Sequence, residues 1–201
     1  MKVAVLASGR GSNFQSIINS CEKGLSPNTN LKHLIVNNQD AYAIKIAKKH
    51  NISYTFIESK NRKREYFDQK VLEILEKHEI EIVVLAGFMR ILSPILTQTY
   101  KNRIINIHPS LLPLFPGVNA HKDTIAAGAK HSGCTVHIVD EGVDTGPIII
   151  QDTIELDEGE TVESLSNKIL PIEHKIFPKA IELLCSNKIQ VHGRDVTIKP
   201  D

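Results

Sequence analysis

The sequence predicts an α/β protein whose core is a Rossmann-like, open, mostly parallel twisted sheet with helices on both faces. Three observations support this class. Short apolar runs alternate with amphipathic stretches along the first half of the 201-residue chain, as expected of parallel strands that are buried on both faces. A glycine-rich segment follows the first apolar run, at the position where such folds hold anions. Polar residues gather after later apolar runs, where open α/β sheets bind ligands.

Five strands and three helices are expected in the first half of the chain. The expected strands are short apolar runs at residues 3–7, 31–36, 52–57, 82–86 and 103–107. The expected helices have apolar residues at the spacing of one helix face, and they cover residues 13–21, a stretch after Asp40 and residues 61–78. Asp40 is expected to cap the second of these helices.

The second half of the chain has a different pattern. Residues 108–117 carry three prolines and one glycine, which is too many for regular structure. Strands at 134–139 and 148–156 are expected to be antiparallel, because the segment that joins them is short. A helix at 162–184 is expected to bend or break at its prolines, and a hairpin is expected at 190–198. No repeat or linker divides the chain, so we expect a single domain over residues 1–201.

Composition excludes several functional classes. The chain has 24 Lys and Arg against 23 Asp and Glu, a formal net charge of +1, so no overall basic field would attract nucleic acid or an anionic membrane. An anionic ligand must therefore be held by a local site. Three separated cysteines without a CxxC pair indicate reduced thiols in a cytoplasmic protein. The opening apolar run is too short for a signal peptide or a membrane span. The histidines and cysteines lack metal-site spacing, so no metal is expected.

The glycine-rich segment Ser8-Gly9-Arg10-Gly11-Ser12-Asn13 lies between an expected strand and an expected helix. Backbone amides at the start of a helix point outward at the positive end of the helix dipole, which suits a phosphate. Ser12 and Asn13 could cap the helix and donate to phosphate oxygens. The segment matches neither a P-loop nor a full dinucleotide fingerprint. A tight turn that binds no ligand is therefore an equally good interpretation of this segment alone.

Asn106 and His108 lie at the end of the fifth expected strand. Alternate residues of an extended chain point to the same side, and Pro109 favours an extended His108. An amide donor beside an imidazole could stabilise a developing oxyanion. Without further context, the two side chains could instead only cap a turn.

Two further segments are candidates for a site. The loop Asp140-Glu141-Gly142-Val143-Asp144-Thr145-Gly146-Pro147 carries three carboxylates. Asp144 could approach a histidine, keep it protonated and relay a proton, although a solvated acidic turn would have the same sequence. The apolar segment from Gly87 to Leu92 could line a slot for a flat ring or belong to the core. Arg64 could meet an acidic group, or it could be one of many exposed charges.

Taken together and in this order, these motifs resemble the folate-dependent formyltransferases, and within them the phosphoribosylglycinamide formyltransferase family of purine synthesis. The resemblance covers almost the whole chain. The glycine-rich loop is the part that is specific to the ribonucleotide enzymes. The other motifs that carry the resemblance are Leu85-Ala86-Gly87-Phe88-Met89-Arg90-Ile91-Leu92, Asn106-Ile107-His108-Pro109-Ser110-Leu111-Leu112-Pro113, Phe115-Pro116-Gly117 and Asp144-Thr145-Gly146-Pro147-Ile148-Ile149.

The resemblance implies a role for each motif. The implied catalytic residues are Asn106, His108 and Asp144. Phosphate binding is implied for Gly11, Ser12 and Asn13, and Glu173 would hold the amine end of the substrate. The implied folate contacts are Arg64, Met89, Arg90, Ile91, Leu92, Asn106, Asp140, Glu141, Gly142, Val143 and Asp144. The N-terminal half would then bind phosphate, and the C-terminal half would bind folate and carry out catalysis.

The implied reaction moves a formyl group from 10-formyltetrahydrofolate to the amine of glycinamide ribonucleotide. Asn106 and a protonated His108 would stabilise the oxyanion of the tetrahedral intermediate, and Asp144 would keep His108 charged and assist proton transfer. The protein would bind these two small molecules and neither nucleic acid nor a membrane, and it would be a monomer or a homodimer.

Three alternatives differ in what they need. A methionyl-tRNA formyltransferase would carry an extra C-terminal domain and a basic surface. A formyltetrahydrofolate hydrolase would usually carry an extra N-terminal domain, whereas the first strand here is expected to begin at Lys2. A non-enzymatic nucleotide-binding module would keep the glycine-rich loop but would not need Asn106, His108 and Asp144 together.

Overall fold

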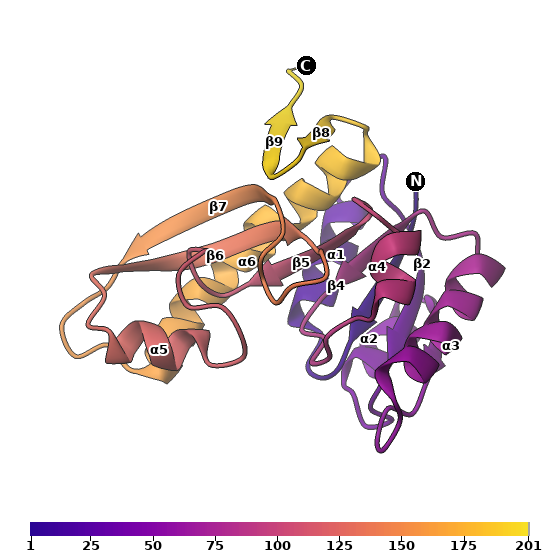
Figure 1. Cartoon of the computed structure of the whole chain (residues 1–201), viewed down its shortest axis with the longest axis horizontal. Helices are drawn as coiled ribbons and strands as arrows, with labels where there is room; N and C mark the ends of the chain where they lie inside the picture. The colour runs from indigo at the N-terminus through magenta and orange to yellow at the C-terminus, as the bar shows by residue number, and fades with distance from the viewer. Residues whose placement is uncertain (201) are drawn as a thin grey trace.

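The computed structural model describes residues 1–200 and is built around one seven-stranded sheet with the strand order β3-β2-β1-β4-β5-β6-β7 (Figure 1). Strands β1 to β5 are parallel, and β6 and β7 are antiparallel to their neighbours. The predicted fold class is therefore confirmed. The strands are β1 Lys2–Ala7, β2 Asn30–Val36, β3 Ser53–Phe56, β4 Ile82–Leu85, β5 Ile104–His108, β6 His131–Ile138 and β7 Ile148–Glu155.

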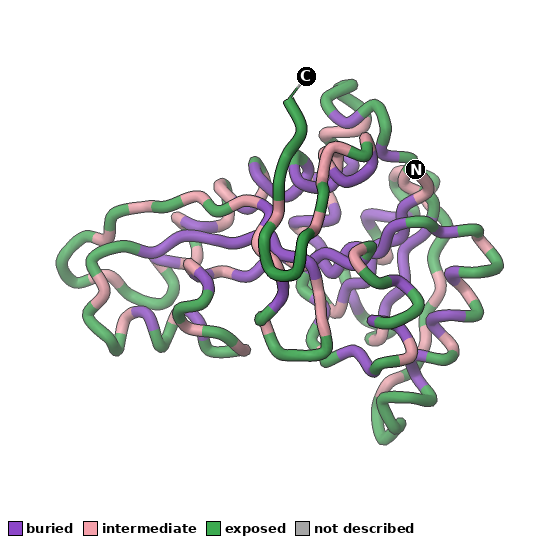
Figure 2. Tube along the Cα trace, turned by 45° about the horizontal axis from the view of Figure 1, so that its top comes forward, coloured by how far each residue is buried: buried purple, intermediate pink, exposed green. Residues whose placement is uncertain are grey.

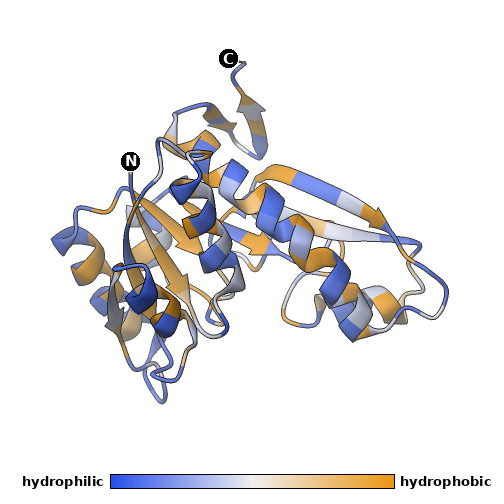
Figure 3. Cartoon of the chain, turned by 180° about the vertical axis from the view of Figure 1, so that it is seen from behind, coloured by the Kyte–Doolittle hydropathy of each residue, from blue (hydrophilic) through white to orange (hydrophobic). Residues whose placement is uncertain are grey.

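Helices cover both faces of the sheet because the central strands are apolar on both sides. In β1, Val3 and Val5 pack with residues of α1, α2 and α6, whereas Ala4 and Leu6 pack with residues of α3 and α4. Figure 2 shows the buried chain concentrated along these strands, and Figure 3 shows the long helix α6 on the face seen from behind. The helices are α1 Ser12–Glu22, α2 Ala43–Lys49, α3 Arg64–Lys77, α4 Pro94–Thr99, α5 Ala120–Ala126 and α6 Val162–Cys185.

The C-terminal part contains a separate small hairpin formed by β8 (Ile189–His192) and β9 (Asp195–Ile198), as predicted. Its turn reaches the loop after β6, where Arg194 Nη2 donates to the Thr145 carbonyl at 2.5 Å. Within residues 1–200, no helix has the length and apolar character needed to cross a membrane.

Four details differ from the sequence-based expectations. The N-cap position of α2 is Tyr42, and Asp40 instead belongs to a turn in which its amide donates to Asn38 Oδ1 at 3.0 Å. Helix α3 begins at Arg64 rather than near residue 61, because a turn precedes it. Helix α6 contains Pro171 and Pro178 but runs without a break from residue 162 to residue 185. The short helices α4 and α5 were not predicted.

Candidate active site

The end of β5 places Asn106 and His108 on one side of the strand, as predicted. Strand β6 runs antiparallel beside β5, and its register sets Asn106 opposite His137. The Asn106 Nδ2 atom lies 3.2 Å from His137 Nε2. Two polar side chains from neighbouring strands therefore meet where β5 ends.

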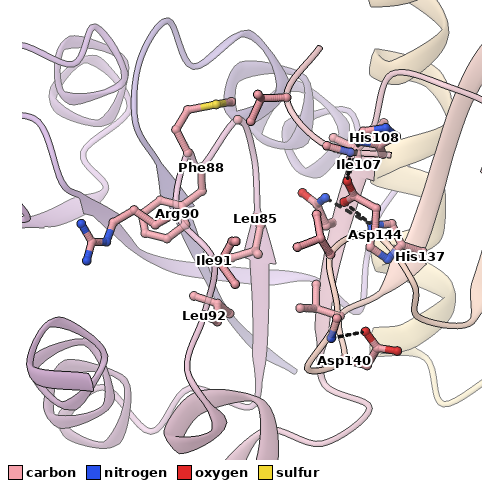
Figure 4. Close-up of a pocket in the computed structure, with 18 of the residues that line it drawn as sticks. Leu85, Phe88, Arg90, Ile91, Leu92, Ile107, His108, His137, Asp140 and Asp144 are labelled. Carbon is pink, nitrogen blue, oxygen red and sulfur yellow. Dashed lines mark hydrogen bonds and ion pairs between the residues drawn. The ribbon is translucent and has the colours of Figure 1, made fainter. Parts of the chain in front are cut away.

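Asp144 joins this pair from the loop between β6 and β7. Its Oδ2 lies 3.3 Å from His108 Nδ1, and its Oδ1 lies 3.5 Å from His137 Nε2. The Gly117 amide donates to Oδ2 at 2.8 Å. Figure 4 shows His108, His137 and Asp144 converging at one end of a pocket. The structure thus brings Asp144, more than thirty residues further along the chain, beside the strand that carries Asn106 and His108.

Local loop geometry holds Asp144 in this position. Asp140 Oδ1 accepts hydrogen bonds from the Gly142 amide at 3.0 Å and from Thr145 Oγ1 at 2.7 Å, so the loop folds back on itself. A Cβ atom on Gly146 would lie 1.8 Å from the Ile138 carbonyl oxygen, so only glycine lets the loop return this close to β6. Asp144 itself has a φ of 54°, a conformation that aspartate tolerates better than most residues.

The surroundings of Asp144 favour its ionised form. Burial acts to raise the pKa of Asp144, but hydrogen bonds from His137 and the Gly117 amide, together with the charges of the two histidines, lower it to about 2. Asp144 is therefore a carboxylate throughout the physiological pH range.

His108 differs from the expectation that Asp144 would keep it charged at neutral pH. Burial lowers the pKa of His108, and the Phe115 carbonyl and Asp144 oppose that shift without reversing it. The Phe115 carbonyl oxygen lies 2.9 Å from His108 Nε2 and can only accept, so Nε2 carries a proton. His108 is thus a buried imidazole that gains a proton more readily when a second negative charge forms beside it.

His137 is a site residue that the sequence reasoning missed. It is buried, and its Nδ1 lies 2.9 Å from the Ile138 carbonyl oxygen, so Nδ1 carries a proton and Nε2 is the nitrogen that faces Asn106. The available signal was a lone imidazole in an expected strand whose other residues are mostly apolar. Sequence alone did not reveal that this strand pairs with the one carrying Asn106.

A pocket of about 240 Å³ opens beside these residues. Its walls are largely apolar and come from the end of β4 and from the loop after β6, and Asn106, His108, Asp140 and Asp144 supply polar groups. Such a lining suits a flat, partly polar ring. Most of the predicted folate contacts line it: Met89, Arg90, Ile91, Leu92, Asn106, Asp140, Gly142, Val143 and Asp144.

Two predicted folate contacts lie outside this pocket. Glu141 is exposed and accepts a hydrogen bond from Gln98 Nε2 at 2.9 Å. Arg64 is exposed at the start of α3. Arg90 lines the pocket, but its guanidinium points away from His108 and Asp144 (Figure 4).

The glycine-rich loop forms the start of α1. Gly11 occupies the N-cap position with a φ of 74°, and no side chain caps the helix, so Ser12 and Asn13 do not have the capping role that we expected. The first amides of a helix have no carbonyl partner within the helix, and they remain suited to an anion. A Cβ atom on Gly11 would lie 2.9 Å from Ala43 Cβ, so packing against α2 also requires glycine.

Asn13 and Glu173 connect this loop to α6. Asn13 Nδ2 donates to Glu173 Oε2 at 2.8 Å, and both residues are buried. Burial raises the pKa of Glu173, and the Asn13 hydrogen bond is the one group that opposes the shift. Asn13 Oδ1 is buried without a hydrogen-bond partner among residues 1–200. Among residues 1–200, Glu173 forms no ion pair with a Lys, Arg or His side chain.

Ser8 joins the loop and the pocket. Its amide donates to the Gly87 carbonyl at 3.1 Å, and its Oγ accepts from the Met89 amide at 2.9 Å. Met89 lines the pocket, so the glycine-rich loop borders the segment that forms the pocket wall. Among residues 1–200, no group of three or more His, Cys, Asp and Glu side chains is arranged to hold a metal ion.

Comparisons with known proteins identify the family of this chain. Residues 1–181 match the family of formyl transferases. The chain is 42% identical over 184 residues to phosphoribosylglycinamide formyltransferase of Bacillus subtilis, covering 91% of this chain and 94% of that protein. It is also 42% identical to the trifunctional purine biosynthetic protein adenosine-3 of Chironomus tentans, covering 96% of this chain but only 14% of that much longer protein.

A solved structure shares the whole fold. Glycinamide ribonucleotide transformylase 1 from Symbiobacterium toebii superimposes with a TM-score of 0.96 at 38% identity, and the match covers 100% of this chain and 94% of that one. The chain therefore belongs to the formyl transferase family and, within it, to the phosphoribosylglycinamide formyltransferases.

Proposed function

We propose that this protein transfers the formyl group of 10-formyltetrahydrofolate to the amine of glycinamide ribonucleotide, giving formylglycinamide ribonucleotide and tetrahydrofolate in purine synthesis. The observation that carries the proposal is the convergence of Asn106, His108 and Asp144 at one end of an apolar pocket. The glycine-rich loop borders the pocket through the hydrogen bond between Ser8 and Met89, and Asn13 links the loop to Glu173. The loop and Glu173 would hold the phosphate and the amine end of the second substrate.

Two donors would act on the developing oxyanion. The neutral amine attacks the formyl carbon, and the formyl oxygen gains negative charge as the new carbon–nitrogen bond forms. One N–H of Asn106 Nδ2 faces His137 at 3.2 Å, which leaves the other free to donate to that oxygen. His108 would take up a proton of the attacking amine, through water, as the charge grows, would stabilise the oxyanion as an imidazolium, and would give the proton up again as the intermediate collapses. Removing one such donor typically lowers kcat by about a hundredfold to a thousandfold.

Asp144 would stabilise the charged form of His108 and assist the proton transfer. Its carboxylate is ionised and faces both histidines. It would stabilise the His108 imidazolium and help to move the proton of the attacking amine, through water, to the folate nitrogen as the bond between that nitrogen and the formyl carbon breaks. One proton leaves the amine and one reaches the folate nitrogen, so the exchange requires no other reactant.

His137 would act as a positioning residue in this scheme. The Ile138 carbonyl fixes the proton on His137 Nδ1, so Nε2 accepts from Asn106 and sets the orientation of the Asn106 amide. Without this partner, the Asn106 amide could turn its oxygen, which cannot donate, toward the oxyanion.

We further propose that the chain works as a single catalytic unit, with phosphate binding in its N-terminal half and folate binding and catalysis in its C-terminal half. One continuous sheet carries both parts, because the strands that lead into the glycine-rich loop and into Asn106 are both paired to β4.

A direct assay tests the function. The purified protein is mixed with 10-formyltetrahydrofolate and glycinamide ribonucleotide, and formylated product and tetrahydrofolate are both quantified. We expect equal amounts of the two products and no release of formate. Consumption of the formyl donor without glycinamide ribonucleotide would instead identify a hydrolase, and transfer only to methionyl-tRNA would identify the other formyltransferase. Either result would contradict the proposal.

A further inference from the structure

The loop that carries Asp144 is held from outside as well as from within. Its internal bonds are those of Asp140, whose Oδ1 accepts from the Gly142 amide and from Thr145 Oγ1. On the outer side, Arg194 Nη2 donates to the Thr145 carbonyl oxygen at 2.5 Å. The two residues are 49 positions apart in the chain, so this bond ties the loop to a distant part of the protein.

Arg194 belongs to the turn of the β8–β9 hairpin. His192 pairs with Asp195, so the hairpin closes through a two-residue turn made of Gly193 and Arg194. Gly193 has a φ of 64°, and glycine adopts this conformation at the first position of such a turn without strain. The turn therefore has a defined shape, from which the Arg194 side chain reaches the loop.

The hairpin is anchored to the body of the protein. Ile189, Val191 and Val196 are partly buried and pack against the hydrophobic core. Strand β9 also lies against β7, the strand that follows the loop of Asp144 (Figure 1). The Arg194 side chain thus extends from a fixed support.

The Arg194 guanidinium has no competing partner. It is exposed, and across residues 1–200 no carboxylate lies within 4.0 Å of it. Within the same residues, the bond to the Thr145 carbonyl is the only hydrogen bond that this side chain makes. Arg194 does not line the pocket, so it can influence the reaction only through the loop.

Asp144 needs such support because of its backbone conformation. Its φ of 54° lies in the left-handed region, which is strained for a residue with a side chain and persists only where the surroundings hold it. The next residue, Thr145, is bonded through its hydroxyl to Asp140 and through its carbonyl to Arg194. These bonds fix the direction in which the Asp144 side chain leaves the backbone, so Oδ2 stays 3.3 Å from His108 Nδ1.

We propose that Arg194 is a positioning residue for formyl transfer, which holds the loop so that Asp144 stays against His108; this inference rests on the proposed function. A displacement of about 1 Å near a reacting centre can lower a rate by about a hundredfold. Arg194→Met keeps the length of the side chain but cannot donate. It should lower kcat by about tenfold, because the other bonds of the loop remain and hold Asp144 part of the time. KM for glycinamide ribonucleotide should stay within about threefold of wild type.

The test is a double-mutant cycle between Arg194→Met and Asp144→Asn. The kcat and both KM values are measured for wild type, the two single variants and the double variant, at a temperature at which thermal unfolding shows all four to be folded. If Arg194 acts through the Asp144 carboxylate, the double variant should be no slower than Asp144→Asn alone, because the two changes remove the same interaction. A further tenfold loss in the double variant would overturn the inference.

The pKa of His108 gives a second readout that a general loss of stability would not change. Burial lowers this pKa, and the Asp144 carboxylate acts to raise it. His137 and His121 are the other titratable groups that act on His108, and both remain in the variant. If Arg194→Met lets Asp144 move away, the pKa of His108 should fall, whereas loss of a nearby positive charge alone would raise it. An NMR titration that finds a rise or no change would overturn the inference.

Arg103→Met is the matched control. Arg103 is exposed and its Nη2 donates to the Thr99 carbonyl at 2.8 Å, so this variant removes the same kind of bond at the end of β5 far from His108. It should keep the wild-type kcat and the wild-type pKa of His108. Normal formyl transfer by Arg194→Met, or a change in KM alone, would overturn this inference and leave the proposed function intact. Absence of transfer by the wild-type protein would overturn the proposed function, and the titration of His108 would still test the Arg194 contact.

Discussion

Replacing Glu173 by glutamine should make the protein more stable and less active. Glu173 is 8% exposed and accepts one hydrogen bond, from Asn13 Nδ2 at 2.8 Å. Burial raises the pKa of its carboxyl group, and no cation offsets the shift. A glutamine would keep an acceptor for Asn13 and would add an N–H that could satisfy the unpartnered Asn13 Oδ1.

The sign of the effect follows from proton binding. The folded-state pKa of Glu173 is above the ordinary value of 4.5, so folded protein retains the proton at pH values where unfolded protein has lost it. Wild-type stability therefore falls as pH rises from about 4.5 through the folded-state pKa. An unsatisfied buried group costs about 1–3 kcal/mol, so Glu173→Gln should raise the free energy of unfolding at pH 8 by that amount. For a chain of this size, Tm should rise by roughly 2–10 °C.

Urea unfolding followed by far-UV circular dichroism at pH 8 and pH 4.5 measures this effect. The stabilisation should be present at pH 8 and nearly absent at pH 4.5. The same variant should have a KM for glycinamide ribonucleotide raised by about tenfold or more, because a neutral amide attracts the amine end of the substrate less strongly than a carboxylate does.

Glu163→Gln is the matched control. Glu163 is exposed in the first turn of the same helix, where a negative charge is mildly stabilising. Its replacement should lower stability slightly at pH 8 and leave KM unchanged. A Glu173→Gln variant that is less stable than wild type at pH 8, or equally stabilised at both pH values, would refute the reasoning.

Three further predictions concern other parts of the structure. Burial, together with the charges of His78 and Lys77, lowers the pKa of His33 to about 4, so the unfolded chain binds a proton at a higher pH than the folded protein does. The free energy of unfolding should therefore fall by at most about 3 kcal/mol as pH decreases from about 6.5 to about 4. Urea unfolding of the His33→Gln variant should show a smaller decline over the same pH range. Gly146→Ala should lower the free energy of unfolding by roughly 1–3 kcal/mol and reduce kcat, because its Cβ would collide with the Ile138 carbonyl; unchanged thermal unfolding would contradict this. His137→Phe should lower kcat by up to about a hundredfold with little change in either KM, and steady-state kinetics in which KM alone changes would argue against a positioning role.

The hydrophobic pattern was sufficient to predict the main sheet. Runs such as Val3–Ala7 and Ile82–Ala86 are apolar at every position, and this pattern occurs in strands buried on both faces. The strand ends then indicated where Asn106 and His108 would lie. The short helix α4 was not predicted, although Ser93 and Pro94 form a helix-start signal. Its N-terminus is also held by a distant residue, since the Ser93 amide donates to Asp68.

Features that depend on strand register and burial could not be predicted. His137 meets Asn106 only because β6 runs antiparallel to β5 in one particular register. The pKa of His108 depends on how deeply the ring is buried, and burial outweighs the effect of the neighbouring carboxylate. The direction of Arg90 is set by two backbone carbonyls of a turn about thirty residues earlier. None of these relations leaves a local signature in the sequence.

The most direct measurement is single-turnover formyl transfer by the Asp144→Asn variant, with binding of both substrates measured in parallel by calorimetry. Asparagine keeps the shape of the side chain but removes the negative charge that faces the two histidines. The rate of transfer should fall by at least about a hundredfold, and both Kd values should stay within about threefold of wild type. Near-normal transfer, or a loss that is confined to substrate binding, would contradict the proposed role of Asp144 beside His108.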